Sequence, residues 1–226
     1  MISFLLIVVA VVFLNRQLAT LAVASVAGQP TTHKSLPQLT QLVLYADRLY
    51  GEKKWLAAEK AYLKVLKQDH KNAAAYGHLG IIYSTQKNLP DAIECFEIAA
   101  RLKPSGSTYQ NLALGYYENH NYMKAIAAFD KAIMFEPTAT RYIGLSKAYK
   151  RITNVDQMIM ALEKASELDP SARILHLLAA AYQDNGRRSE SIAVYRRLHL
   201  LDPSDADVAR MIGIHLPERS STVTST

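Results

Sequence analysis

The sequence has little of what disulfide-linked, thiolate-zinc or β-rich proteins need. Its single cysteine, Cys95, excludes an intramolecular disulfide and any zinc site with two or more thiolate ligands. Nine glycines and eight prolines among 226 residues are few for a chain with many tight turns, which disfavours a β-rich fold. Hydrophobic residues make up 50% of the chain, so it can bury a sizeable core, and the composition favours helices.

Strong charge is also missing. The 26 Lys and Arg residues exceed the 20 Asp and Glu residues only slightly, for a net charge of +6, and the excess is spread along the sequence instead of forming a tail. No stripe of aromatic residues alternates with the basic ones, as RNA-binding surfaces require. We therefore expect no nucleic-acid partner.

Residues that could carry catalysis or bind a metal do not converge. The seven histidines form no pair at i and i+4 and no His-Glu-x-x-His pattern, and Cys95 directly precedes a residue of the expected core. The chain also lacks a glycine-rich phosphate loop and a Gly-x-Ser-x-Gly motif. We predict that the chain is not an enzyme and that it has no catalytic residue, metal site, cofactor or small-molecule substrate.

The first 28 residues differ from the rest. The chain is apolar from Ile2 to Leu14 except for Ser3, and a weaker apolar run follows. Basic residues occur after this run and none precedes it, which predicts one transmembrane or signal-anchor helix at 1–28 with the remaining chain in the cytoplasm. Residues 29–38 are expected to be a linker.

A cleaved signal peptide is the alternative for the same segment. Ser25-Val26-Ala27 resembles the small-residue site at which such peptides are cut. On that interpretation the mature domain is exported to the periplasm or secreted and serves in envelope assembly.

Beyond this segment, proline recurs every 33 residues. Proline cannot continue the interior of a helix, so each of these prolines marks the same helix end in successive units. Ahead of each proline, a leucine is followed four residues later by a tyrosine, which places both on one helix face. The prolines are Pro104, Pro137, Pro170 and Pro203, and the pairs are Leu79 and Tyr83, Leu112 and Tyr116, Leu145 and Tyr149, and Leu178 and Tyr182.

One such unit, residues 73–105, resembles the tetratricopeptide repeat at nearly every signature position, with Tyr76 in place of the leading tryptophan. The other matching positions are Leu79, Gly80, Tyr83, Ala92, Phe96, Ala99 and Pro104. The resemblance implies an all-α, right-handed superhelical array of helix-turn-helix repeats. The expected repeats are 39–72, 73–105, 106–138, 139–171 and 172–204, followed by a capping helix at 205–216 and a flexible tail at 217–226.

The resemblance also implies a concave groove, lined by the first helix of each unit, that binds a protein or peptide partner. Lys147, Lys150 and Arg151 lie at i, i+3 and i+4 and would direct three positive charges into it, so an acidic segment or a terminal carboxylate is the expected ligand. A solvated helix face without a partner is the alternative. The predicted groove residues are Gln110, Leu114, Tyr117, Ile143, Lys147, Lys150, Arg151, His176 and Gln183.

These observations predict a membrane-tethered scaffold that binds a partner segment. A recruiting or regulatory subunit of a membrane enzyme complex is a further alternative. Some tetratricopeptide domains grip the acidic tails of chaperones through Lys and Asn in their first unit, but Val43 and Asp47 stand at those positions here, which disfavours that partner.

Overall fold

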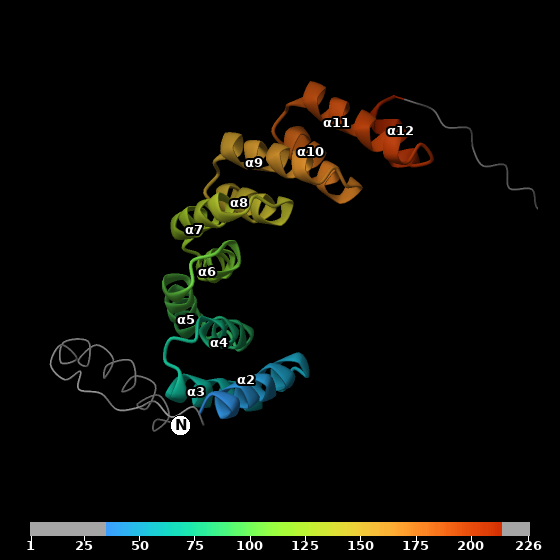
Figure 1. The fold of residues 1–226 in the computed structure, drawn as a ribbon. Coiled ribbons are helices and arrows are strands. Elements are labelled where there is room, and N and C mark those ends of the chain that lie inside the picture. The colour runs from blue at the N-terminus through green and yellow to red at the C-terminus, as the bar shows by residue number, and fades with distance from the viewer. Residues whose placement is uncertain (1–34, 214–226) are drawn as a thin grey trace, which may run out of the picture. The chain divides into compact units, whose positions relative to one another are not determined.

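In the computed structural model of this protein, residues 35–213 are described, and this part of the chain contains helices and no strand (Figure 1). The repeats belong to one compact unit, which begins at Leu39. The helices are α2 (Ser35–Gly51), α3 (Trp55–Gln68), α4 (Ala73–Thr85), α5 (Leu89–Leu102), α6 (Gly106–Glu118), α7 (Tyr122–Phe135), α8 (Ala139–Arg151), α9 (Val155–Leu168), α10 (Ala172–Asp184), α11 (Arg188–Leu201) and α12 (Ala206–Met211).

The helices from α2 to α11 form consecutive pairs, each joined by a turn of three residues. From α3 onward every helix contacts the next one in the chain, and the first helix α6 also contacts the first helices α4 and α8 on either side of it (Figure 1). The pairs therefore stack in chain order. The predicted all-α array of helical repeats is confirmed, whereas its right-handed superhelical sense stays a prediction.

Each turn between the two helices of a pair is built in the same way. Its middle residue has a positive φ, 59° at His120 for example. In that turn the N–H of Asn121 donates to the carbonyl of Tyr116 at 2.9 Å, and the N–H of His120 donates to that of Tyr117 at 3.0 Å. These bonds form a Schellman motif, which satisfies carbonyls left open at the helix end. The positive-φ residues at the turns are Lys53, Lys87, His120, Thr153 and Gly186.

The repeating leucines form the core of the array. Leu79 and Leu178 are 1% and 2% exposed, and the equivalent Leu112 and Leu145 are also buried. Two aromatic rings require glycine opposite them: a Cβ on Gly80 would lie 2.5 Å from Phe96, and one on Gly144 would lie 2.4 Å from Phe129. The second helix of a pair ends two residues before each of the four regularly spaced prolines, as the sequence predicts.

Two predicted boundaries differ from the structure. Helix α2 begins at Ser35, within the predicted linker 29–38. Pro37 stands in its first turn, where a backbone N–H has no helical partner, so the proline does not prevent a helix from starting there. Helix α12 ends at Met211 and not at the predicted residue 216. Directly after Met211, Ile212 and Gly213 form a turn in which Gly213 has a φ of 78°. Residues 214–226 lie outside the described part of the chain.

The predicted membrane segment, residues 1–28, also lies outside the described residues. Among residues 35–213, no helix combines the length and the apolar character needed to cross a bilayer.

Candidate functional site

The cations predicted from the sequence lie together on α8. Lys147, Lys150 and Arg151 are all exposed, and none of them forms an ion pair with a carboxylate of the described residues. We call these three residues the basic set. Two of them stand in the last turn of α8, where positive charge interacts favourably with the helix dipole.

Arg151 is held in place by the preceding repeat. Its Nε donates a hydrogen bond to the hydroxyl of Tyr122 at 2.9 Å, and its guanidinium carbon lies 5.1 Å from the centre of the Tyr122 ring. The Tyr122 hydroxyl is also 2.9 Å from Nδ1 of His120 and can donate its own proton there. An arginine fixed in this way loses less conformational freedom when it binds an anion.

Tyr122 also connects the basic set to another predicted groove residue. The ring of Tyr117, on α6, packs edge-on against the ring of Tyr122 with centroids 5.6 Å apart. Leu114, one turn earlier on α6, is 43% exposed. The structure thus brings Tyr117 and Arg151 together through one tyrosine at the start of α7.

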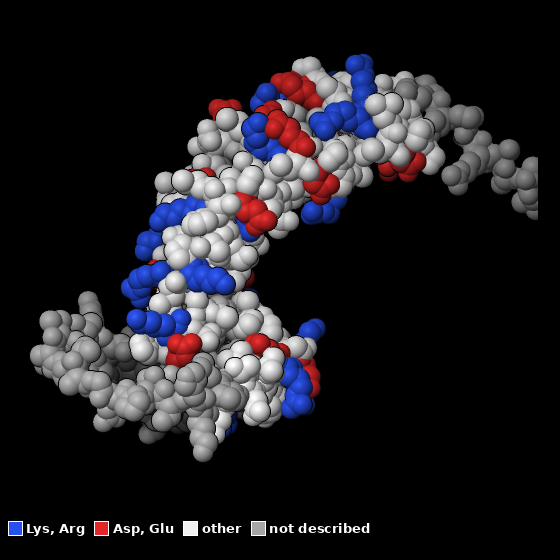
Figure 2. All heavy atoms as spheres, in the orientation of Figure 1, with Lys and Arg blue, Asp and Glu red and all other residues white. Residues whose placement is uncertain are grey.

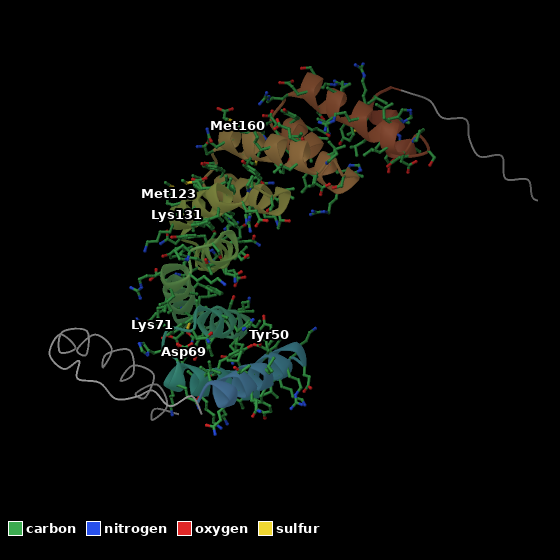
Figure 3. The ribbon with its side chains drawn as sticks, viewed as in Figure 1. Tyr50, Asp69, Lys71, Met123, Lys131 and Met160 are labelled. Atoms are coloured by element: carbon green, nitrogen blue, oxygen red, sulfur yellow. The ribbon has the colours of Figure 1, made fainter. Side chains whose placement is uncertain are left out.

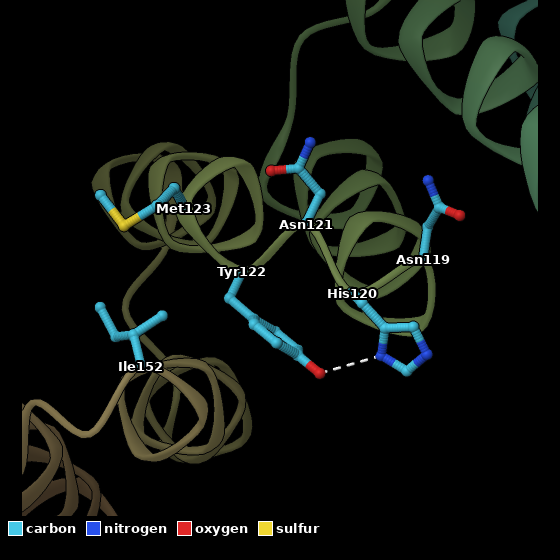
Figure 4. A pocket seen from close by; sticks show the side chains of 6 residues that line it. All are labelled: Asn119, His120, Asn121, Tyr122, Met123 and Ile152. Atoms are coloured by element: carbon cyan, nitrogen blue, oxygen red, sulfur yellow. Dashed lines mark hydrogen bonds between the residues drawn. The ribbon is translucent and has the colours of Figure 1, made fainter.

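A shallow pocket of about 410 Å³ adjoins this tyrosine (Figure 4). Figure 4 shows Met123 and Ile152 on one side of the Tyr122 ring and His120 at its hydroxyl end. The pocket lies at the turn between α6 and α7, beside the end of α8. It is lined by Asn119, His120, Asn121, Tyr122, Met123 and Ile152.

Two predicted groove residues contact neighbouring helices. Ile143 is only 7% exposed and packs with Ala165 and Ile174, because α8 turns this side toward α9 and α10. Its assignment to the groove is therefore wrong. Gln110 is partly buried, and its Oε1 accepts a hydrogen bond of 3.1 Å from Nε of Arg141.

Arg141 and Tyr122 are two contact residues that the repeat pattern does not indicate. Arg141 is 4% exposed, and its Nη1 lies 2.9 Å from a carboxylate oxygen of Glu136 and also donates to the Glu136 backbone carbonyl. Buried cations of this kind are normally paired, as this one is. Tyr122 stands where Trp55 and Leu89 stand in earlier repeats, and nothing in that pattern points to its contact with Arg151.

The remaining predicted residues lie on α10. His176 and Gln183 are both exposed, and both contact Tyr195 on α11: the His176 ring lies edge-on at 6.5 Å, and Gln183 Oε1 accepts a hydrogen bond of 3.3 Å from the hydroxyl. Within residues 35–213, no hydrogen bond, ion pair or ring contact joins either residue to the basic set.

A second polar cluster lies between α2 and α4, far along the chain from the basic set. Tyr62 donates to Asp47 at 2.7 Å, and the ring of His78 lies 4.7 Å from that of Tyr50, which stands between α2 and α4 in Figure 3. Burial lowers the pKa of His78 below its usual value, and the nearby Asp47 carboxylate offsets only part of this shift. The Asp47 side chain is thus already a hydrogen-bond acceptor.

Other basic residues lie on the second helices. Figure 2 shows Lys and Arg side chains gathered along the side of the array formed by α5 and α7, where acidic side chains also occur. On α3, Lys60, Lys64 and Lys67 are exposed and form no ion pair with the described residues. Within residues 35–213, no group of three His, Cys, Asp or Glu side chains is placed to hold a metal ion.

Comparison with known protein families gives a consistent picture. Three tetratricopeptide repeat models match residues 46–107, 139–171 and 174–209, which together make up more than half of the chain. No curated protein matches the sequence.

Solved structures of tetratricopeptide proteins have the same fold. A crystal structure of MamA is 26% identical, with a TM-score of 0.64 over 72% of this chain and 96% of MamA. MamA from Desulfovibrio magneticus RS-1 is 15% identical, with a TM-score of 0.65 over 74% and 97% of the two chains. YrrB, described as a TPR protein with an unusual peptide-binding site, is 16% identical, with a TM-score of 0.61 over 76% and 91%. The chain is therefore built of tetratricopeptide repeats.

Proposed function

We propose that this chain is a protein-interaction scaffold and that its basic set binds an acidic segment of a partner protein. One observation carries the proposal: three exposed cations share one face of α8 and have no carboxylate partner among the described residues. Carboxylates are the natural counter-ions for such a surface, and Arg binds them bidentately. The peptide-binding site named for the YrrB structure supports a recognition role for this fold.

The surroundings of the basic set suit an extended segment. Helices α6 and α8 contact each other, so the exposed Leu114 and the cations of the basic set lie on neighbouring first helices, and Tyr117 is linked to Arg151 through Tyr122. In a right-handed superhelix these first helices line the concave side, where one segment reaches several repeats. Each exposed ion pair contributes only about 0.2–1 kcal/mol, so specificity comes from several contacts in a fixed register.

The proposal assigns recognition, and no catalytic step, to this chain. We further propose that residues 1–28 tether the scaffold to a membrane with the repeats in the cytoplasm, on the basis of the apolar run and the basic residues that follow it. A tether raises the local concentration of whatever the repeats recruit. Carbonate extraction and the mass of the mature protein test this part, because a cleaved signal peptide would release a soluble, shorter chain.

Affinity capture with matched variants tests the recognition role. The full-length chain is compared with a variant that carries Lys147→Ala, Lys150→Ala and Arg151→Ala, and with a control that carries Lys60→Ala, Lys64→Ala and Lys67→Ala on α3. All six side chains are exposed and form no ion pair in the described residues, so both variants lose the same charge. The α8 variant also loses the contacts of Arg151 with Tyr122. We expect partners to be lost only from the α8 variant. Equal capture by all three proteins would contradict the proposal.

A further inference from the structure

The pocket beside Tyr122 has an apolar wall that carboxylate binding does not use. The Tyr122 ring, Met123 and Ile152 form this wall, and the turn residues Asn119 to Asn121 form the other (Figure 4). Pockets that hold small ligands measure about 300–1,000 Å³, so about 410 Å³ accommodates one side chain of leucine size.

The apolar wall and the basic set are physically continuous. Tyr122 accepts the hydrogen bond from Arg151, and Ile152 follows Arg151 directly at the end of α8. A bound partner segment whose carboxylate contacts Arg151 therefore brings its own next residue to the pocket, since consecutive Cα atoms are about 3.8 Å apart.

Met123 is the uncovered part of this wall. It is 66% exposed on α7, where Figure 3 shows it pointing outward. Methionine has a flexible thioether side chain and adapts to apolar partners of varied shape. Tyr122, in contrast, is fixed by His120 and Arg151, so the pocket combines one rigid and one adaptable surface.

We propose that this pocket receives an apolar side chain that stands next to the acidic residues of the bound segment. The inference rests on the proposed function and adds to it: the partner motif is an acidic pair adjoined by a leucine-sized residue. Charge complementarity with the basic set decides where the segment lies, and the pocket selects the neighbouring side chain.

Capped peptides titrated into the isotopically labelled full-length chain test this inference, with backbone amide shifts as the readout. The peptides are Gly-Glu-Glu-Leu-Gly, Gly-Glu-Glu-Ser-Gly and Gly-Gln-Gln-Leu-Gly. We expect the leucine peptide to bind at least about threefold more tightly than the serine peptide, since burying part of a leucine side chain is favourable. The amide of Met123 should shift with the Glu-Glu-Leu peptide and not with the Glu-Glu-Ser peptide, whereas the amide of Ile152, next to Arg151, should shift with both.

Met123→Ser should remove this preference for leucine and leave the affinity for the serine peptide unchanged. Met134→Ser is the matched control, because Met134 lies on the same helix, is 85% exposed and does not line the pocket. Equal affinity of the leucine and serine peptides for the native chain would overturn the pocket assignment. Equal affinity of the Glu and Gln peptides would instead overturn the role of the basic set, so the two failures are distinguishable.

Discussion

The hydroxyl of Tyr182 on α10 donates a hydrogen bond to the carboxylate of Glu163 on α9, and Tyr116 on α6 makes the same bond with Glu97 on α5. In both cases the tyrosine follows the carboxylate by 19 residues and joins one pair of helices to the preceding pair. Burial, followed by this hydrogen bond, raises the pKa of Tyr182 to about 12 and also raises that of Tyr116. The contact between neighbouring repeats therefore depends on protonated tyrosines.

This arrangement predicts alkaline unfolding. A group whose pKa is raised by folding contributes its full stabilisation below its unfolded pKa, about 10 for tyrosine, and loses it as the pH rises to the folded value. For Tyr182 that interval runs from about pH 10 to about pH 12. Chemical denaturation at several pH values should show a steeper loss of unfolding free energy in this interval for the native chain than for Tyr182→Phe. Tyr45→Phe, which removes a hydroxyl from a tyrosine that is 47% exposed, is the control.

Two glycines on α4 predict opposite effects of the same substitution. A Cβ at Gly80 would lie 2.5 Å from Phe96, so Gly80→Ala should destabilise the chain by about 1–3 kcal/mol. Nothing lies within 4 Å of a Cβ at Gly77, so Gly77→Ala should stabilise the helix by about 0.5–1 kcal/mol. Thermal and denaturant unfolding measure both changes. Destabilisation of similar size at the two positions would refute the assigned contact with Phe96.

The turn residue Thr153 has a conformation that suits glycine better. Its φ is 57°, whereas the equivalent residue of the next repeat is Gly186 with a φ of 72°. A β-branched residue in this region costs of order 1 kcal/mol, so Thr153→Gly should raise the unfolding free energy by about that amount. Gly186→Ala should lower it by a similar amount. A lower unfolding free energy for Thr153→Gly together with a higher one for Gly186→Ala would show that these turns are not left-handed in solution.

The buried Arg141 should be a major contributor to the contact between the third and fourth pairs. Its removal leaves Gln110 without its hydrogen bond, so Arg141→Ala should cost about 2–4 kcal/mol. The guanidinium carbon also lies 2.7 Å from the place of a Cβ on Gly106. Gly106→Ala should therefore be less destabilising in the Arg141→Ala background than in the native chain. Additive effects in this double-mutant cycle would rule out the contact.

The sequence predicted those features of the fold that repeat. Leucine and tyrosine recur with the 33-residue period because every unit packs its first helix in the same way, and Leu79 and Leu178 are indeed buried. Features particular to one junction could not be predicted. Arg141 and Ile143 lie on one helix with exposed lysines, and only the packing of α8 against its neighbours decides that these two are buried. Tyr122 could not be identified either, because its contact with Arg151 joins residues 29 apart in different repeats.

Binding of a defined acidic peptide to the full-length chain tests the central claim most directly. The probe is a capped hexaglutamate peptide, titrated at low and at physiological salt into the native chain, a Lys147→Gln, Lys150→Gln, Arg151→Gln variant and a Lys60→Gln, Lys64→Gln, Lys67→Gln control. We predict that the α8 variant binds about tenfold more weakly than the native chain, that the α3 control binds like the native chain, and that salt weakens native binding. Unchanged binding by the α8 variant, or an equal loss in the control, would contradict the assignment of the basic set as the site that binds the partner.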